Sequence, residues 1–166
     1  MKRPLVGILI GSESDLRVME KAAEVLREMG IPYEMELSSA HRLPEKTAKY
    51  AKGARKRGIE VLIAGAGMAA HLAGVLASHT TLPIIGVPIK SGALDGVDAL
   101  YSTVQMPPGV PVATVGIDGA KNAAYLACEI LSIKHPEVTK KLEEFRSRMR
   151  KLLEEKSKAI KKGKSG

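Results

Sequence analysis

The sequence predicts a three-layer α/β fold, in which helices cover both faces of a five-stranded parallel sheet. Short apolar runs of strand length alternate along the chain with longer segments whose apolar residues recur at helical spacing. The chain has 166 residues, of which 45% are hydrophobic and 27% charged, as expected for one globular domain. Strands that alternate with helices are joined by right-handed crossovers, so the sheet should be parallel.

Each expected element follows from a local pattern. Continuous or alternating apolar runs predict five strands, at residues 5–10, 33–37, 61–64, 84–87 and 112–117. Helical spacing of apolar residues, ended in several cases by glycine, predicts helices near 18–29, 44–57, 69–78, 96–104 and 120–131. Five such units are typical of the flavodoxin-like fold.

The segment after residue 135 differs from the rest of the chain. Its apolar residues are spaced alternately by four and three and have charged flanks; they are Val138, Leu142, Phe145, Met149 and Leu152. We divide the chain into an α/β domain at 1–135, a C-terminal helix at 136–160 and a basic flexible tail at 161–166. The helix either packs along its own subunit or packs on another one. We expect the second arrangement, and therefore a homo-oligomer.

The net charge of +8 lies mostly near the end of the chain, since residues from 137 onward carry 11 Lys or Arg and 5 Asp or Glu. The few aromatic residues lie outside any basic cluster, so the sequence offers no surface on which nucleic acid bases would stack. No apolar run reaches the roughly 18 residues of a membrane span, and the first run is short for a signal peptide. We expect a cytoplasmic protein with neither nucleic acid nor membrane as a partner.

Two rare residue types carry further information. The single cysteine, Cys128, lies among apolar residues and is expected to be a small buried side chain. The chain also has one Asn and one Gln beside many charged residues, which indicates a thermophilic source. A midpoint of thermal unfolding in the ordinary mesophilic range would contradict that hypothesis.

Polar or glycine-rich segments directly follow three of the predicted strands, at Gly11–Asp15, Ser38–Arg42 and Gly65–His71. In open α/β sheets, ligands bind at the carboxyl ends of the strands, so we expect these segments to form one ligand-binding edge. Ser38–Arg42 combines two hydroxyls with an imidazole, which transfers protons near neutral pH, and a guanidinium, which holds phosphate or carboxylate. In isolation, the same pattern is also typical of a solvated turn.

The other two segments have alternative interpretations as well. Ser12 or Ser14 would cap a helix with Asp15 in its first turn, or the same segment would hold a phosphate and ribose hydroxyls. The Gly65–His71 segment is either a tight turn or a place where backbone approaches a ligand. His71 and His79 fall on one predicted helix, but this face lacks Cys, Asp and Glu, so no metal site is predicted.

The ordered set of motifs resembles the family of N5-carboxyaminoimidazole ribonucleotide mutases, the catalytic subunits of phosphoribosylaminoimidazole carboxylase in purine synthesis. The matching segments are Gly11–Asp15, Ser39–Arg42, Gly65–Leu72, Val104–Pro107 and Asn122–Ala124. The resemblance covers residues 5–135. One departure is Ala73, where the family often has proline.

The resemblance implies a reaction without metal or organic cofactor. A carboxylate moves from the exocyclic nitrogen of an aminoimidazole ribonucleotide to ring carbon C4, by decarboxylation and recarboxylation. His41 would be the general acid and base. The resemblance also implies that the protein is a homo-octamer. The implied substrate-binding residues are Ser12, Ser14, Asp15, Ser39, Arg42, Ala66, Gly67, Ala70, His71 and Leu72.

The resemblance also implies separate roles within that set. Asp15 would hold the ribose hydroxyls, and Ser39 and Arg42 would hold the 5′-phosphate with help from backbone near Ser12 and Ser14. The Gly65–Leu72 segment would wall a dry pocket that retains CO2, with His71 at its carboxylate end.

Two alternatives stay open at this point. A second branch of the family carboxylates the aminoimidazole ribonucleotide directly with CO2, and the Gly65–Leu72 segment favours the mutase branch over it. A non-catalytic nucleotide-binding protein, with the C-terminal helix recruiting a partner, would keep its function after His41→Asn. A response-regulator receiver is disfavoured, because no acidic cluster follows the first strand.

Overall fold

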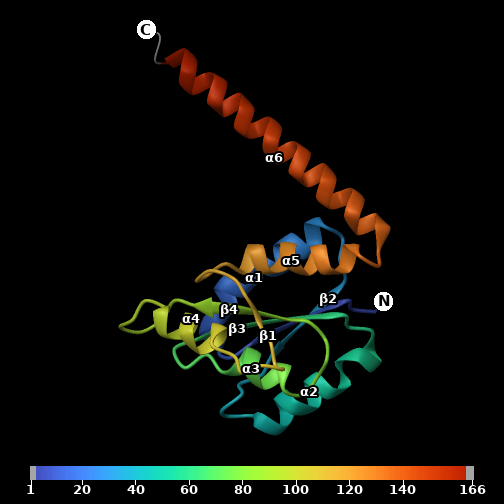
Figure 1. Ribbon diagram of the computed structural model, residues 1–166, viewed down its shortest axis with the longest axis vertical. Helices are drawn as coiled ribbons and strands as arrows, with labels where there is room; N and C mark the ends of the chain where they lie inside the picture. Colours follow the sequence, from blue (N-terminus) through green and yellow to red (C-terminus); the bar gives the residue numbers. More distant parts are fainter. Residues whose placement is uncertain (1–2, 164–166) are drawn as a thin grey trace.

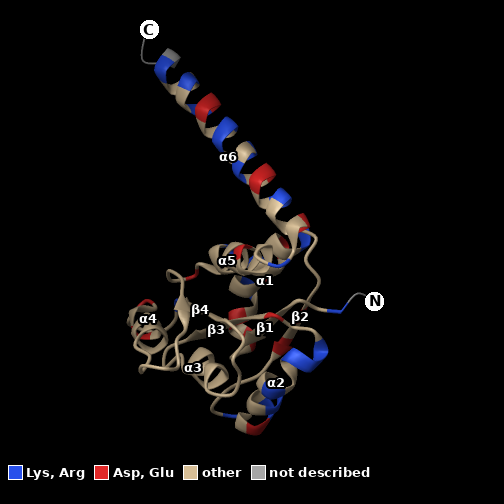
Figure 2. Ribbon diagram, turned by 45° about the vertical axis from the view of Figure 1, so that its right-hand side comes forward, with Lys and Arg blue, Asp and Glu red and all other residues tan. Residues whose placement is uncertain are grey.

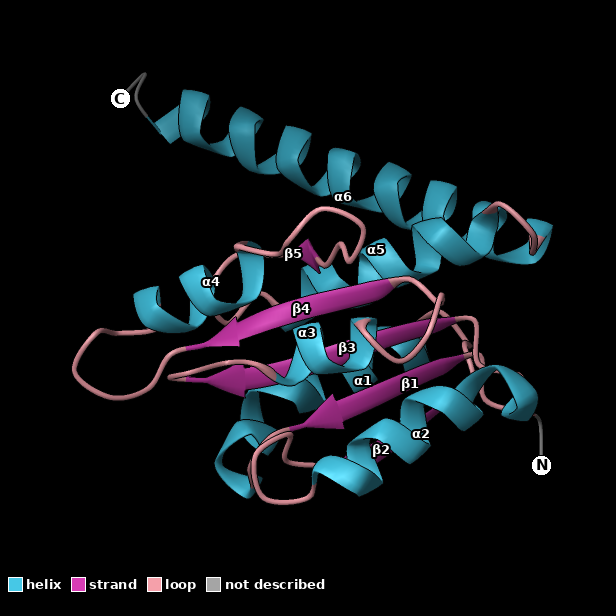
Figure 3. Cartoon of the chain, turned by 60° about the horizontal axis from the view of Figure 1, so that its bottom comes forward, coloured by secondary structure: helices cyan, strands magenta, loops and turns pink. Residues whose placement is uncertain are grey.

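The computed structural model describes residues 3–163. Its centre is a sheet of five strands in the order β2-β1-β3-β4-β5, and every neighbouring pair is parallel. Figure 3 shows the larger strands side by side with their arrows pointing the same way. The strands are β1 (Val6–Ile10), β2 (Tyr33–Leu37), β3 (Val61–Gly67), β4 (Ile84–Ile89) and β5 (Ala113–Thr114). The predicted five-stranded parallel sheet of a flavodoxin-like fold is confirmed.

Helices cover both faces of this sheet, as predicted (Figure 1). Helices α1 and α5 pack on one face with the side chains of Ile8, Ile63 and Ile85, and α2 and α3 pack on the other with Leu9 and Leu62. The helices are α1 (Leu16–Glu28), α2 (Pro44–Arg57), α3 (Leu72–Ala77), α4 (Val97–Val104), α5 (Ala120–Ser132) and α6 (Pro136–Gly163), and a short 3-10 helix, η1 (Glu13–Asp15), precedes α1.

Several elements differ from the sequence prediction. Strand β4 runs through Pro88 to Ile89 instead of ending at residue 87. Strand β3 continues through Gly65–Gly67, which we expected to be a loop, because its last residues pair with Pro88 and Ile89 of β4. Strand β5 is only two residues long instead of spanning 112–117. Helix α3 begins at Leu72 rather than near residue 69 and ends at Ala77, so His71 precedes it and His79 follows it.

Helix α6 leaves the α/β body at an angle (Figures 1 and 2). Val138 and Leu142 are buried in the core that α5 helps to form. The later seam residues Met149 and Leu152 are 45% and 51% exposed. The first part of the seam therefore packs on its own chain, whereas the second part has no partner within the described residues. The helix runs three residues past the expected end at 160, and residues 164–166 of the expected tail lie outside the described range.

The single cysteine, Cys128, is fully buried, as predicted. Burial raises the pKa of its thiol to about 11. Across residues 3–163, no helix combines the length and the apolar character that a membrane crossing requires.

Candidate active site

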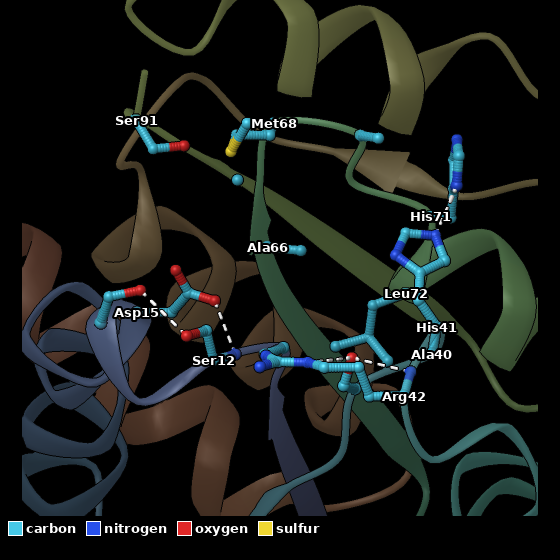
Figure 4. Close-up of a pocket in the computed structure, with 15 residues that line it drawn as sticks. Ser12, Asp15, Ala40, His41, Arg42, Ala66, Met68, His71, Leu72 and Ser91 are labelled. Carbon is cyan, nitrogen blue, oxygen red and sulfur yellow. Dashed lines mark hydrogen bonds between the residues drawn. The ribbon is translucent and has the colours of Figure 1, made fainter.

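A pocket lies at the carboxyl edge of the sheet, where the strand order changes direction. In the sheet, β2 lies on one side of β1 and β3 lies on its other side. The chain from β1 crosses to β2, so the loops that follow β1 and β3 diverge and leave a crevice. The cavity has a volume of about 480 Å³. The carboxyl ends of four strands and the segments that follow them line it with Gly11, Ser12, Ser14, Asp15, Ser39, Ala40, His41, Arg42, Ala66, Gly67, Met68, Ala69, His71, Leu72 and Ser91 (Figure 4).

The loop after β1 is organised by a buried carboxylate. Asp15 is 5% exposed, and its Oδ2 accepts a hydrogen bond of 2.9 Å from the backbone N–H of Ser12. Burial raises the pKa of Asp15, although hydrogen bonds from Ser12 and Ser14 and the charge of Arg42 oppose the rise. Ser12 is the N-cap residue of η1 with Asp15 in its first turn, and the same carboxylate also lines the pocket.

The loop after β2 is fixed at both of its ends. Ser38 is fully buried, its Oγ lies 2.7 Å from Oγ1 of Thr47, and its N–H donates to the carbonyl of Ile10. At the far end, the N–H of Leu43 donates to the carbonyl of Ser39. These bonds hold the segment that carries His41 at the mouth of the pocket, where it forms a turn with the side chains of His41 and Arg42 exposed.

Arg42 connects this loop with the loop after β1. Its Nη2 donates to the carbonyl oxygen of Gly11 at 3.3 Å, and its Nε donates to Oγ of Ser39 at 3.4 Å. A guanidinium has five N–H donors, so others remain for an anionic ligand. Arg42 and Ser39 together therefore form a candidate anion-binding corner of the pocket.

The end of β3 brings bare backbone to the pocket. A Cβ on Gly65 would lie 2.4 Å from Sδ of Met19, and one on Gly67 would lie 2.3 Å from Oγ of Ser91. The chain then turns through Met68 at φ 53°. This turn carries His71 to the loop after β2, where its Nδ1 lies 2.8 Å from Nε2 of His41. The two imidazole rings meet edge to face, with their centroids 5.0 Å apart.

The structure brings together ten of the eleven residues that the sequence indicated. All except Ala70 line the cavity, whereas Ala70 is buried and only 2% exposed. Gln105 and Asn122, which belong to motifs that match the family, are not among the lining residues.

Five lining residues are absent from the predicted set, namely Gly11, Ala40, Met68, Ala69 and Ser91. Four of them lie within the three segments singled out above. Ser91 follows β4, so the rule about carboxyl ends of strands would have found it. Its Oγ is buried and has no hydrogen-bond partner among the described residues. Residues 3–163 also contain no cluster of three or more His, Cys, Asp or Glu side chains suited to a metal ion.

Fold and pocket together define a flavodoxin-like α/β protein with a candidate binding pocket, lined by the guanidinium of Arg42, at its topological switch point. The AIR carboxylase family matches residues 5–152, and the chain belongs to this family.

Individual relatives cover nearly the whole chain. N5-carboxyaminoimidazole ribonucleotide mutase of Pyrococcus horikoshii is 60% identical, over 96% of this chain and 90% of the relative. The mutase of Thermotoga maritima is 57% identical, over 95% and 92%. Phosphoribosylaminoimidazole carboxylase of Schizosaccharomyces pombe is 49% identical over 98% of this chain, which corresponds to 29% of that longer protein. Among solved structures, Treponema denticola PurE matches with a TM-score of 0.81 and 33% identity, over 94% of this chain and 98% of that one.

Proposed function

We propose that this protein is an N5-carboxyaminoimidazole ribonucleotide mutase of de novo purine biosynthesis. The reaction would convert its substrate to 4-carboxy-5-aminoimidazole ribonucleotide. The observation that carries the proposal is one cavity of about 480 Å³ lined by the imidazole of His41, the guanidinium of Arg42 and the carboxylate of Asp15. The names of the relatives from Pyrococcus and Thermotoga support it.

The chemistry of the pocket suggests how each part of the ribonucleotide would bind. Arg42 and Ser39 would hold the 5′-phosphate, with backbone N–H groups near Ser12 and Ser14 contributing. The buried carboxylate of Asp15 would accept hydrogen bonds from the ribose hydroxyls. The imidazole ring and its carboxylate would then lie toward the His41 side, against the wall formed by Ala66, Gly67 and Leu72.

The reaction requires one group to give a proton and later to take one. His41 would protonate the exocyclic nitrogen as the N–CO2 bond breaks, which releases CO2 into the pocket. C4 of the electron-rich ring would attack the CO2, and His41 would remove the C4 proton to restore aromaticity. An imidazole suits both steps near neutral pH. No metal or organic cofactor takes part in this scheme.

Retention of CO2 requires a site closed to water, yet His41 and His71 are exposed on the single chain. We therefore propose that a neighbouring subunit completes the enclosure in a homo-octamer. Exposed apolar side chains support such assembly: Leu94 and Tyr101 near α4 are 61% and 60% exposed, and the distal seam of α6 is uncovered. We place the enzyme in the cytoplasm, where its nucleotide substrate would be made and used.

Two substrates in separate assays test the proposal. The carbamate substrate is supplied in buffer containing 14C-bicarbonate, and the expected product carries no label because the carboxylate is transferred within the site. Turnover of free aminoimidazole ribonucleotide with bicarbonate, and none of the carbamate, would instead assign direct carboxylation.

The variant His41→Asn separates an enzyme from a non-catalytic binding protein. It should keep the fold and the affinity for ribonucleotide but lose nearly all turnover. His79→Asn is the matched control, because His79 lies outside the pocket. Equal turnover by His41→Asn and the wild type would refute the assignment of His41 as the acid and base.

A further inference from the structure

Two histidines from separate loops share one hydrogen bond at the pocket. Nε2 of His41 lies 2.8 Å from Nδ1 of His71, although the residues are 30 positions apart. Such a bond requires one nitrogen to donate and the other to accept, so it fixes a tautomer as well as a ring orientation. Figure 4 shows the ring of His41 between His71 and the cavity, with its other nitrogen, Nδ1, turned toward the cavity.

The backbone around His71 restrains that partner. Its N–H donates to the carbonyl of Ala69, and its carbonyl accepts from the N–H of Val75 in the first turns of α3. The turn at Met68 sets the direction from which the ring arrives. His71 is therefore attached to a fixed element, as a residue that orients another side chain should be.

One direction of the hydrogen bond suits both protonation states of His41. As a cation, His41 donates from both nitrogens, so its bond to His71 persists only if Nδ1 of His71 accepts. After His41 loses the proton on Nδ1, its Nε2 still donates to the same acceptor. With the opposite direction, in which His71 donates, protonation of His41 would break the bond.

We propose that His71 is a positioning residue that accepts a hydrogen bond from Nε2–H of His41 and so makes Nδ1 of His41 the proton-transferring atom. This inference rests on the proposed function. Nδ1–H of the cationic His41 passes its proton to the exocyclic nitrogen of the substrate. The lone pair left on Nδ1 later takes the C4 proton, which restores the starting state, and the Nε2 proton stays in place throughout.

The other charged or titratable side chains that line the cavity are Asp15 and Arg42. Arg42 donates to Ser39 of its own loop and to the carbonyl of Gly11 in the loop after β1, and Asp15 accepts from the backbone N–H of Ser12 in that second loop. Among the described residues, neither side chain forms a hydrogen bond or ion pair with the histidine pair, which leaves His71 as the group that orients His41.

Neutron diffraction on deuterated wild-type crystals tests the direction of the bond without an assay. We expect deuterium on Nε2 of His41 and none on Nδ1 of His71. Deuterium on Nδ1 of His71 would overturn the proposal, whether it replaced the one on Nε2 of His41 or accompanied it.

Two substitutions test the consequence for turnover. In His71→Asn the amide oxygen reaches about the position of the imidazole Nδ1 and can accept the same bond, whereas the side chain in His71→Leu cannot. His71→Asn should keep kcat within about threefold of the wild type, and His71→Leu should lower kcat by about 10- to 100-fold with little change in KM. Equal kcat values for the two variants, whether both high or both low, would contradict the positioning role.

Failure of the proposed function and failure of the positioning role of His71 would give different results. If the wild type does not convert the carbamate substrate, the proposed function fails, and the neutron result still decides which histidine donates. If the wild type is active and His71→Leu is equally active, only the present inference fails. Midpoints of thermal unfolding for both variants serve as the fold control.

Discussion

The ring of Phe145 on α6 stacks on the ring of Tyr125 on α5, with centroids 4.5 Å apart and planes inclined by 24°. Together with the buried side chains of Val138 and Leu142, this stack attaches the first half of α6 to the body of its own chain.

Phe145→Ala should loosen that attachment. The change removes a half-buried ring and its aromatic partner, so we expect the free energy of unfolding to fall by about 1–3 kcal/mol. Urea denaturation measures the loss, and hydrogen exchange of the α6 amides should show faster opening. Lys151→Ala, at an exposed position of the same helix, is the control and should change stability little.

The exposed half of α6 should contribute to assembly. Met149→Glu combined with Leu152→Glu places charges on the distal seam, and we expect the variant to have a smaller mass in solution than the wild type. Light scattering after size-exclusion chromatography gives that mass. Lys151→Glu also alters charge on this helix, but off the seam, and should leave the mass unchanged. A monomeric wild type at micromolar concentration would contradict both the octamer and the role of this seam.

Gly65→Ala should destabilise the protein because a Cβ has no room there. The new atom would lie 2.4 Å from Sδ and 2.7 Å from Cγ of Met19, so the side chain packed beneath the pocket must move. Overpacking of this kind costs about 1–3 kcal/mol, which calorimetry would detect as a lower midpoint of thermal unfolding. Gly116→Ala is the matched control, since a Cβ at Gly116 meets nothing within 4 Å. Equal midpoints for the two variants would show that Met19 yields without cost.

Asp15→Asn should weaken substrate binding and remove a pH dependence of stability. Burial raises the pKa of Asp15, so the folded state retains this proton to higher pH than the unfolded state does. The protonated Asp15 therefore makes its full contribution to the free energy of unfolding below its pKa in the unfolded state, which is about 3.9. This contribution is lost as the pH rises through its pKa in the folded state. The amide variant has no such loss.

Urea unfolding of both proteins across this pH range measures the effect, and the stability of the wild type relative to the variant should decline as the pH rises. A flat difference would contradict the raised pKa. Binding is measured separately by calorimetry with ribonucleotide. Loss of a hydrogen bond to a charged group costs about 1.5–3 kcal/mol, so the affinity should fall by about 10- to 100-fold.

The sheet and most of the pocket could be predicted from the sequence because they depend on local patterns. Buried apolar runs define the strands, and the rule that ligands bind at the carboxyl ends of strands groups the segments around Asp15 and His41. The parts that were missed depend on pairing between distant residues. Gly67 is in a strand because it pairs with Ile89 of β4, although its local sequence indicates a loop.

The hydrogen bond between His41 and His71 illustrates the same limit. Each histidine could be placed on the binding edge from its position after a strand. The contact between them, however, depends on the turn at Met68 and on the late start of α3. Neither feature has a signature in the spacing of apolar residues, so the direct contact was not predicted.

The buried hydroxyl pair of Ser38 and Thr47 has a consequence for the energy of binding. Because that pair and the Leu43–Ser39 backbone bond already order the loop, its loss of conformational entropy occurs during folding and not when a ligand arrives. A ligand that meets a preorganised loop retains more of its contact energy as affinity. A flexible version of the same five residues would contain the same functional groups but bind more weakly, and His41 would spend less time in a geometry from which proton transfer is possible.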